Sequence, residues 1–434
     1  HGADIYSTDM ILTPTEDGWV ANGPKYYIGN GNVAGRLSVF GKFADTGEYV
    51  FFLVDTQAPE YELEKNVVAD QMYVSAFSLH DYPVSRADIL HTGKAAWDAA
   101  LATVNVGKVN LGWASTGIAE HAFYEAVTHA DNRVLYGEKV TTFPHVRRMF
   151  ADAYARLLAM KLYSARSADY FRCASEDDRR FLLFNPITKM KVTSEGERVV
   201  DLLWEIIAAR GFENDTYFEQ AAQHIRALPK LEGTVHVNLA LVLKFLPQYL
   251  MAQGEYPEIP VRQDAADDSY LFQQGPAKGL GKITFAPWRP PLEQYKHLPN
   301  VATFLAQVDA FTQLVMTNPP TPEQQKDLDF LLTLGQLFTQ VVYAQLVCES
   351  AGQQRPGTVS DLAGFGEAHL DRIFAVFVQD VSEIAVQLHG QASATDGQRE
   401  AALGLIKAPV IDASAENAFV DEVLSLSGAY VMPE

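Results

Sequence analysis

The sequence is poor in cysteine and has no long apolar run. Its 434 residues include only two cysteines, Cys173 and Cys348, which lie far apart in the chain. This usage fits a reducing compartment better than a disulfide-stabilised secreted fold, so we expect an intracellular, cytoplasmic protein. The longest apolar stretches, such as residues 239–243, are interrupted by Lys244 and Pro247 before they reach the ~20 residues that a membrane span needs. We therefore expect no membrane span.

Positive charge is also scarce. The chain has 34 Lys and Arg against 54 Asp and Glu, which gives a formal net charge of −20. Such a charge repels phosphate backbones and anionic lipid, so we expect no nucleic-acid partner. Apolar residues make up 48% of the chain, which is enough to bury a large core in two or three domains.

Several familiar motifs are missing. The eleven histidines form neither an HExxH motif nor a Cys/His ligand array, so we expect no metal site. No Gly-x-Ser-x-Gly elbow suggests a serine hydrolase. Residues 29–35 (GNGNVAG) resemble a dinucleotide-binding fingerprint, but the last spacing is one residue too long and a β-rich segment follows. We interpret this segment as a plain hairpin turn.

The pattern along the chain predicts an α+β fold in three parts with a linker. Short β-rich runs separated by Asn-Gly and Thr-Gly turns predict a small antiparallel β domain over residues 1–91. Helical spacing, as in Ile118, Ala122 and Ala126, predicts a bundle of long helices over residues 92–252. Residues 253–299 are rich in Pro and Gly, which predicts a linker. A C-terminal helical domain is expected over residues 300–434, with one helix that starts at a capping box formed by Thr321 and Gln324.

Three blocks in the first 250 residues resemble the acyl-CoA dehydrogenases. They are residues 22–31 (NGPKYYIGNG), 133–137 (RVLYG) and 231–234 (LEGT), and they stand in the family's order and at its separations. The opening Gly2-Ala3-Asp4 resembles a Gly-Ser-Asp segment inside the family's middle β domain. The resemblance therefore implies that the family's N-terminal helical domain is absent from this chain, and the C-terminal helices resemble the extension of the family's larger members.

The resemblance implies FAD as the cofactor and assigns flavin contacts to the first block. By position, Tyr27 covers the flavin ring, while Ile28 and Gly29 lie at its edge. An aromatic face suits a flat heterocycle because stacking buries area without requiring hydrogen bonds. The family has Trp in place of Tyr27 and Thr in place of Gly29, so a side-chain hydroxyl contact is lost. The alternative for Tyr27 is a buried tyrosine in a core strand.

The second block implies an oligomer. Arg133 and Tyr136 are similar to the family's Arg-x-x-Phe-Gly motif, with which one subunit reaches the dinucleotide end of its neighbour's FAD. A planar guanidinium suits phosphate oxygens. The alternative for Arg133 is a surface ion pair. Gly211 matches the last glycine of the family's Gly-Gly-x-Gly turn, whereas Arg210 and Pro144 depart from the family pattern.

The third block assigns the catalytic base to Glu232. Pro229 ends the preceding helix and Gly233 permits close backbone approach, so the carboxylate is presented by a loop at the head of the next helix. The resemblance implies that Glu232 removes the substrate's α-proton while a hydride leaves the β-carbon for the flavin. Such a base needs a pKa raised by desolvation. The alternative is a solvated loop residue.

Further site residues follow from the resemblance. Thr234 and His236 are expected near the flavin, and Gly233 and Ala3 near the substrate. Lys108 stands where the family has an arginine close to the acyl-CoA, and Asn105 where it has an aspartate. The alternative for Asn105 and Lys108 is a helix cap or a surface pair.

The expected function is therefore FAD-dependent α,β-dehydrogenation of an acyl-CoA thioester to the trans-2-enoyl-CoA, as in fatty acid β-oxidation. The expected partners are an electron-transfer flavoprotein and further copies of the chain, in a homodimer or homotetramer. Two alternatives stay open. One is an acyl-CoA oxidase, and the other is a non-catalytic or heteromeric partner subunit of the same fold, which the departures at Gly29, Pro144 and Arg210 favour.

Overall fold

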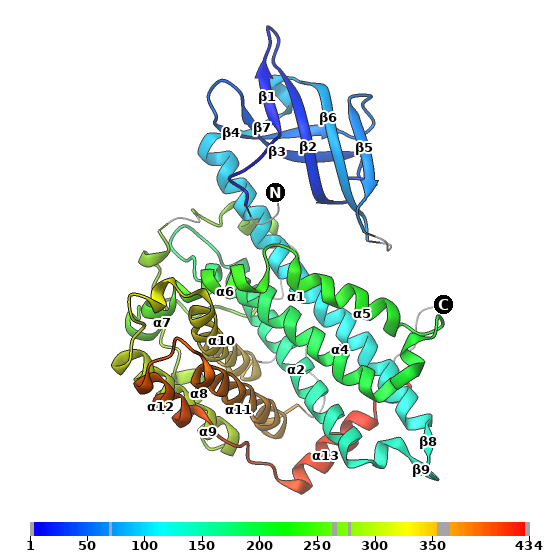
Figure 1. Cartoon of the computed structure of the whole chain (residues 1–434), viewed down its shortest axis with the longest axis vertical. Coiled ribbons are helices and arrows are strands. Elements are labelled where there is room, and N and C mark those ends of the chain that lie inside the picture. The colour runs from blue at the N-terminus through cyan, green and yellow to red at the C-terminus, as the bar shows by residue number, and fades with distance from the viewer. Residues whose placement is uncertain (1–3, 69–71, 263–266, 277–278, 354–364, 430–434) are drawn as a thin grey trace. The chain divides into compact units, whose positions relative to one another are not determined.

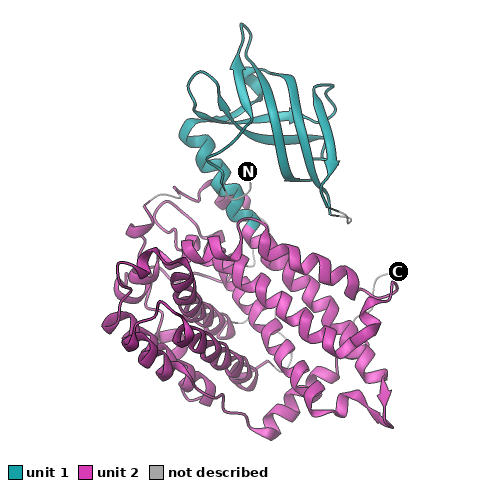
Figure 2. Ribbon diagram, viewed as in Figure 1, with its two compact units in different colours: residues 1–107 teal, residues 108–434 magenta. Residues whose placement is uncertain are grey.

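The computed structural model describes residues 4–68, 72–262, 267–276, 279–353 and 365–429. The chain divides into two compact units, His1–Gly107 and Lys108–Glu434 (Figure 2). The finer division predicted from the sequence, with boundaries after residues 91, 252 and 299, stays a prediction.

Unit 1 is built on a β-sheet, and its described residues contain seven strands (Figure 1). These are β1 (Ile11–Pro14), β2 (Trp19–Gly29), β3 (Arg36–Phe43), β4 (Tyr49–Asp55), β5 (Tyr61–Asn66), β6 (Val74–Val84) and β7 (Ile89–Thr92). Their order across the sheet is β5, β6, β2, β1, β3, β4, β7. Neighbouring strands are antiparallel except β1 and β3, which pair in parallel. The predicted β domain is thus confirmed, with one parallel pair in it.

The core of this sheet is formed by strands whose side chains alternate between buried and partly exposed, as β4 shows. In β4, Val50, Phe52 and Val54 are fully buried, while the residues between them are partly exposed. This is the period of two expected when one face of a strand is covered more than the other. Leu12 and Phe77 belong to the same buried cluster.

The segment at residues 29–35 is a turn, but the predicted hairpin is wrong. β1 lies between β2 and β3 in the sheet, so the two strands that this turn connects do not pair with each other. A strand follows the turn instead of a helix. The loop therefore lacks the helix N-terminus that a dinucleotide-binding glycine loop places against a pyrophosphate.

Helices dominate unit 2, and α1 crosses the boundary between the units. The long helices are α1 (Gly93–Asn132), α2 (Pro144–Arg172), α4 (Thr193–Ile207), α9 (Pro299–Thr317), α10 (Leu328–Ala351) and α11 (Glu367–Gly390). The shorter ones are α3 (Phe181–Ile187), α5 (Phe218–Ala227), α6 (Val235–Leu243), α7 (Leu246–Met251), α8 (Pro290–Glu293), α12 (Asp396–Leu405) and α13 (Ala413–Leu424). The predicted α+β class with additional C-terminal helices is confirmed.

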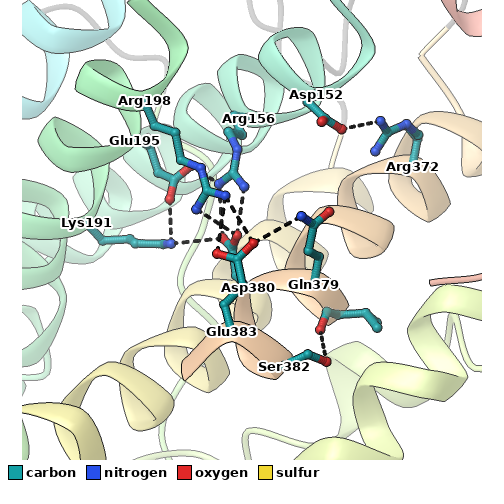
Figure 3. Close-up of polar contacts among 11 residues, drawn as sticks. Asp152, Arg156, Lys191, Glu195, Arg198, Arg372, Gln379, Asp380, Ser382 and Glu383 are labelled. Atoms are coloured by element: carbon teal, nitrogen blue, oxygen red, sulfur yellow. Dashed lines mark hydrogen bonds and ion pairs between the residues drawn. The ribbon is translucent and has the colours of Figure 1, made fainter. Parts of the chain in front are cut away.

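The C-terminal helices pack on the bundle through apolar and charged contacts. α10 packs against α2, α6 and α11, and α11 also packs against α2. Arg156 on α2 donates to Asp380 on α11 over 2.7 and 3.0 Å and to Glu195 on α4 over 2.6 Å (Figure 3). Lys191 pairs with the same two carboxylates, at 2.5 Å from Glu195 and 3.5 Å from Asp380. We call Arg156, Lys191, Glu195 and Asp380 the buried charge network, because each side chain is at most 13% exposed.

The helix expected to start at Thr321 begins later. The predicted capping box exists, since Gln324 N donates to Thr321 Oγ1 over 3.2 Å and Thr321 N donates to Gln324 Oε1 over 2.9 Å. It closes only a short 3₁₀ turn, however, and α10 begins at Leu328 after a second N-cap. Asp327 fills that position, with a carboxylate that accepts from the amides of residues 329 and 330.

Helix α10 is also the one helix of the described residues that is long and apolar enough to cross a membrane. Most of its apolar window, 83%, is buried inside the structure. Core helices of globular proteins commonly have this composition. Burial among other helices therefore accounts for the apolar character of α10.

Candidate active site

A short strained loop carries Glu232. The loop follows a 3₁₀ turn, η5 (Leu228–Lys230), and ends where Thr234 caps α6 by accepting a hydrogen bond from Val237 N over 3.4 Å. Glu232 has a φ of +50° and Gly233 a φ of +83°. Glycine adopts such angles freely, but a glutamate in the left-handed region costs free energy and persists only where its surroundings fix it. The prediction that Glu232 lies on a loop at the head of a helix is confirmed.

Two side chains fix the backbone on either side of Glu232. The amino group of Lys189 donates to the carbonyl oxygen of Pro229 over 2.5 Å and also to that of Gly233. Asn238 Nδ2 donates to the same Gly233 oxygen over 3.1 Å and to Thr234 O over 3.0 Å. Lys189 and Asn238 are both almost completely buried. The carbonyls before and after Glu232 are therefore held from inside the bundle.

Lys189 lies in a π-helical turn, η3 (Thr188–Val192), between α3 and α4. Such turns insert one residue into a helix and occur often at functional sites. Helix α1 passes very close to this turn at Gly112, where a β-carbon would lie 2.5 Å from Thr188 Cγ2. Lys108 lies one helical turn before Gly112, and this close approach brings its charge near Glu232.

Burial and these lysines act on Glu232 in opposite directions. Burial raises the pKa of the Glu232 carboxyl above its ordinary value, and the positive charges of Lys108 and Lys189 reduce that rise. Burial also lowers the pKa of each lysine to about 8. The Glu232 side chain keeps access to solvent in the isolated chain. The result is an accessible carboxylate with a raised pKa, as a general base needs.

The structure places Asn105 and Lys108 in the interior. They are 8% and 7% exposed and lie in the middle of α1, so neither is a helix cap or part of a surface pair. Lys108 belongs to unit 2 and joins the Glu232 loop, whereas Asn105 belongs to unit 1. Ala3, the other predicted substrate contact in this part of the chain, lies outside the described residues.

Apart from the Glu232 loop, unit 2 has a concavity around Arg133. It has a volume of about 810 Å³ and is lined by residues of α1 together with Ile207, Arg210, Asp215 and Tyr217. Among the described residues, the Arg133 side chain makes no hydrogen bond or ion pair, so the surface-pair alternative does not apply. Arg210 is paired with Glu213 over 2.6 Å and with Asp215 over 3.5 Å. The concavity thus contains the guanidinium of Arg133, which makes no hydrogen bond or ion pair within the described residues and suits the phosphates of a dinucleotide.

Tyr136 projects from a hairpin beside this concavity. Strands β8 (Val134–Leu135) and β9 (Glu138–Lys139) are joined by Tyr136 and Gly137, which have φ values of +55° and +85°. Two positive φ values are the signature of a tight two-residue hairpin turn. Tyr136 is 98% exposed and Val134 is 59% exposed. An apolar tip of this kind suits a contact with another molecule.

Gly211 and His236 occupy different surroundings in unit 2. Gly211 is buried in a 3₁₀ turn, where a β-carbon would lie 3.0 Å from Ile207 Cγ2. His236 is exposed on α6 and lines a concavity of about 490 Å³ with Asp327 and Gln387. His236 therefore lies in the first turn of α6, directly after the loop that carries Glu232.

In unit 1, Tyr27 is not a core residue. It is 47% exposed and has a φ of +64°, at a point where the pairing of β2 with β6 shifts register. Tyr26 is also exposed, and the two ring centroids lie 5.8 Å apart. Ile28 continues the strand, with its carbonyl accepting a hydrogen bond from Ser75 Oγ over 3.1 Å. No heavy atom lies within 4 Å of the place where a β-carbon would stand on Gly29. The bulge therefore leaves an open aromatic surface.

Sequence reasoning missed Lys189. A lysine inside the apolar run FLLFNPITKMKV was a possible signal, because a lysine is rarely buried without a partner. The pattern gave no sign of its partners, which lie 40 and 44 residues further along the chain.

Comparison with known proteins supports the resemblance. Residues 96–246 match the family model described as acyl-CoA dehydrogenase, C-terminal domain. Over 251 residues the chain is 23% identical to a 3-(aryl)acrylate reductase of Clostridium sporogenes, covering 56% of this chain and 65% of that protein. Over 248 residues it is 23% identical to the short-chain specific acyl-CoA dehydrogenase of Megasphaera elsdenii, covering 55% of this chain and 63% of that protein. The chain thus spans less than two thirds of the length of these curated relatives.

A solved structure extends the likeness to the C-terminal helices. The chain superposes on the acyl-CoA dehydrogenase from Bacillus anthracis, solved with FAD, with a TM-score of 0.71 and 16% identity. The match covers 98% of this chain and 74% of that one. The fold of the described chain, including α9–α13, is therefore that of an acyl-CoA dehydrogenase.

Proposed function

Since residues 96–246 match the family model described as acyl-CoA dehydrogenase, C-terminal domain, we propose that the chain catalyses FAD-dependent α,β-dehydrogenation of an acyl-CoA thioester. Glu232 is the base. The observation that carries the proposal is its carboxylate, held at a positive φ at the head of α6 with a pKa that burial raises.

The residues of the chain fit FAD. In unit 2, Arg133 lines the concavity of about 810 Å³ and has no partner within the described residues, which suits a diphosphate. In unit 1, the bulge at Tyr27 presents an exposed aromatic ring, which suits a flat heterocycle. We propose that Tyr27, Ile28 and Gly29 contact the flavin, and that Arg133, Tyr136 and Gly211 contact the dinucleotide end.

Glu232 moves the proton in this proposal. Its carboxylate takes the α-proton of the thioester, and the positive charges of Lys108 and Lys189 favour the ionised form that acts as the base. Bound FAD supplies the acceptor for the hydride that leaves the β-carbon. In unit 2, Gly233, Thr234 and His236 are proposed to line the site around Glu232, and in unit 1 Asn105 is proposed as a substrate contact. A raised pKa of the base reduces the difference in proton affinity between the carboxylate and the substrate.

Electron-transfer flavoprotein is the proposed electron acceptor, and a homodimer or homotetramer is the proposed assembly. The exposed tip at Tyr136 supports the assembly, because it projects beyond its own unit's core. Titration with acyl-CoA esters of different chain length would identify the preferred substrate. Reoxidation of the reduced flavin by electron-transfer flavoprotein or by oxygen would identify the electron acceptor. An intracellular location stays a proposal based on the free Cys173 and Cys348.

The test is an anaerobic absorbance titration of the purified protein with a panel of acyl-CoA esters. Bleaching of a bound flavin by one class of ester, in the wild type and not in a Glu232→Gln variant, would support the proposal and identify the substrate class. A protein that is colourless and takes up no added FAD would refute it and favour a partner subunit without catalytic activity.

A further inference from the structure

Burying Lys189 is costly for the fold, because its amino group makes no direct ion pair within the described residues. Its side chain is fully buried, and among the described residues its amino group makes hydrogen bonds to carbonyl oxygens and no ion pair. A buried ammonium loses hydration that neutral carbonyls replace only in part. An unbranched apolar side chain such as methionine would fill the same space without that cost. The amino group itself therefore has a role that packing does not explain.

The partners of Lys189 show what that role is. It joins the carbonyls of Pro229 and Gly233, which flank Glu232, and so closes the loop from beneath. Glu232 has a positive φ, and a non-glycine residue keeps that conformation only when neighbouring contacts hold it. Asn238 contacts the Gly233 side of the loop, whereas Lys189 is the one side chain of the described residues that donates a hydrogen bond to the Pro229 carbonyl.

We propose that Lys189 is a positioning residue that holds Glu232 in the conformation in which it acts as the base. The catalytic part of this inference rests on the proposed function of Glu232. The hydrogen bonds by which Lys189 holds the loop do not depend on that function. Lys189 touches no reacting atom and acts only through the loop and through its charge.

Two lysines from different elements place positive charge near Glu232. Lys108 comes from α1 and Lys189 from η3. Lys230 of η5 is paired with Glu197 over 2.6 Å instead. Lys108 and Lys189 both lower the pKa of Glu232 against the effect of burial. If Lys189 is replaced by a neutral residue, Lys108 remains, and the pKa of Glu232 rises further.

The experiment compares Lys189→Met with Lys191→Met in the full chain. Lys191 lies two residues away in the same π-helical turn, but its amino group pairs with Glu195 and Asp380 and does not contact the loop. It is therefore a matched control for loss of a partly buried lysine. Lys189→Gln keeps a polar side chain without the charge and serves if the methionine variant does not fold.

Two readouts are measured on each variant. Hydrogen-deuterium exchange of peptides covering residues 228–238 reports the clamp without any need for cofactor or activity. The pH dependence of kcat/KM with a reactive acyl-CoA reports the base. For Lys189→Met we expect faster exchange in this loop, a fall in kcat of roughly 10–100-fold with little change in KM, and an acid limb shifted upward by about one pH unit. Lys191→Met should show none of these changes.

The outcomes separate the two proposals. Loop exchange and an acid limb that match the Lys191→Met control would overturn the role of Lys189. Faster loop exchange in Lys189→Met, together with a wild-type protein that oxidises no acyl-CoA, would support the clamp and refute the proposed function. A drop in activity that is accompanied by a lower thermal midpoint but unchanged loop exchange would also overturn the positioning role.

Discussion

Replacing Asp380 by asparagine should destabilise unit 2 more than any other single change in the buried charge network. Asp380 accepts two hydrogen bonds from Arg156, at 2.7 and 3.0 Å, and one from Arg198 at 3.1 Å (Figure 3). Asparagine has nearly the same volume, so no cavity forms, but the variant loses the negative charge and turns an amide donor towards guanidinium donors. Glu195 would then be left to compensate both Arg156 and Lys191. Breaking a buried pair in this way costs about 3–5 kcal/mol.

The assay is urea unfolding, followed by the circular dichroism signal of the helices. If the free energy of unfolding falls by about 3–5 kcal/mol, the thermal midpoint should also fall by on the order of 5–10 °C for a unit of this size. The matched control is Glu383→Gln, because Glu383 is half exposed and contacts only Arg198, at 3.4 Å, within this group of ions. An exposed pair contributes about 0–1 kcal/mol. Equal effects of the two substitutions would refute the assignment of Asp380 as the centre of the network.

The pH dependence provides a second check of the same assignment. Burial alone would raise the pKa of Asp380, but Arg156 and Lys191 outweigh it and hold the pKa below its ordinary value. The ionised carboxylate therefore stabilises the fold above the unfolded pKa of about 4, and this contribution is lost as the pH falls towards the folded pKa. The stability difference between wild type and Asp380→Asn should narrow as the pH is lowered below about 4. A gap that stays constant would contradict the electrostatic explanation.

The other predictions concern the concavity around Arg133, the hairpin at Tyr136 and the base Glu232. Arg133→Gln should weaken FAD binding by roughly tenfold or more without lowering the thermal midpoint of the apoprotein, since the Arg133 guanidinium makes no hydrogen bond or ion pair within the described residues, and equilibrium dialysis would measure the binding. Tyr136→Ser should leave the fold intact because the side chain is 98% exposed, but sedimentation should show weaker self-association, and an unchanged oligomer would exclude the hairpin from the interface. The pKa of Glu232 is raised above its ordinary value of 4.5, so kcat/KM should fall as the pH drops through a value above 4.5; a limb at or below that pH would show that the carboxylate is not desolvated.

Local sequence signals predicted the element that carries Glu232. Helix α5 ends at Ala227, two residues before Pro229, which lies inside η5, and Gly233 directly precedes Thr234, the N-cap of α6. The exposure of Tyr27 and Tyr136 was not predicted, because each depends on a backbone with positive φ that a β-rich pattern does not reveal.

Features that depend on distant partners could not be predicted. Alternation in β1 and β3 shows which side chains face the core, but it does not show that these strands are neighbours and parallel. Thr321 and Asp327 are both good N-cap residues, and only the packing of α10 decides that the helix begins after Asp327. Lys189 lies in a π-helical turn, which has no reliable sequence signature, and its partners belong to a loop brought near by the tertiary fold.

The assignment of Glu232 as the base is tested most directly by exchange of the substrate's α-proton. The purified protein is incubated in D₂O with an acyl-CoA, and deuterium at the α-carbon is followed by NMR for the wild type and for Glu232→Gln. We expect exchange in the wild type and a loss of about 10²–10⁴-fold in the variant, with the fold and FAD content unchanged. Exchange at an equal rate in both proteins would contradict it and would require another residue as the base.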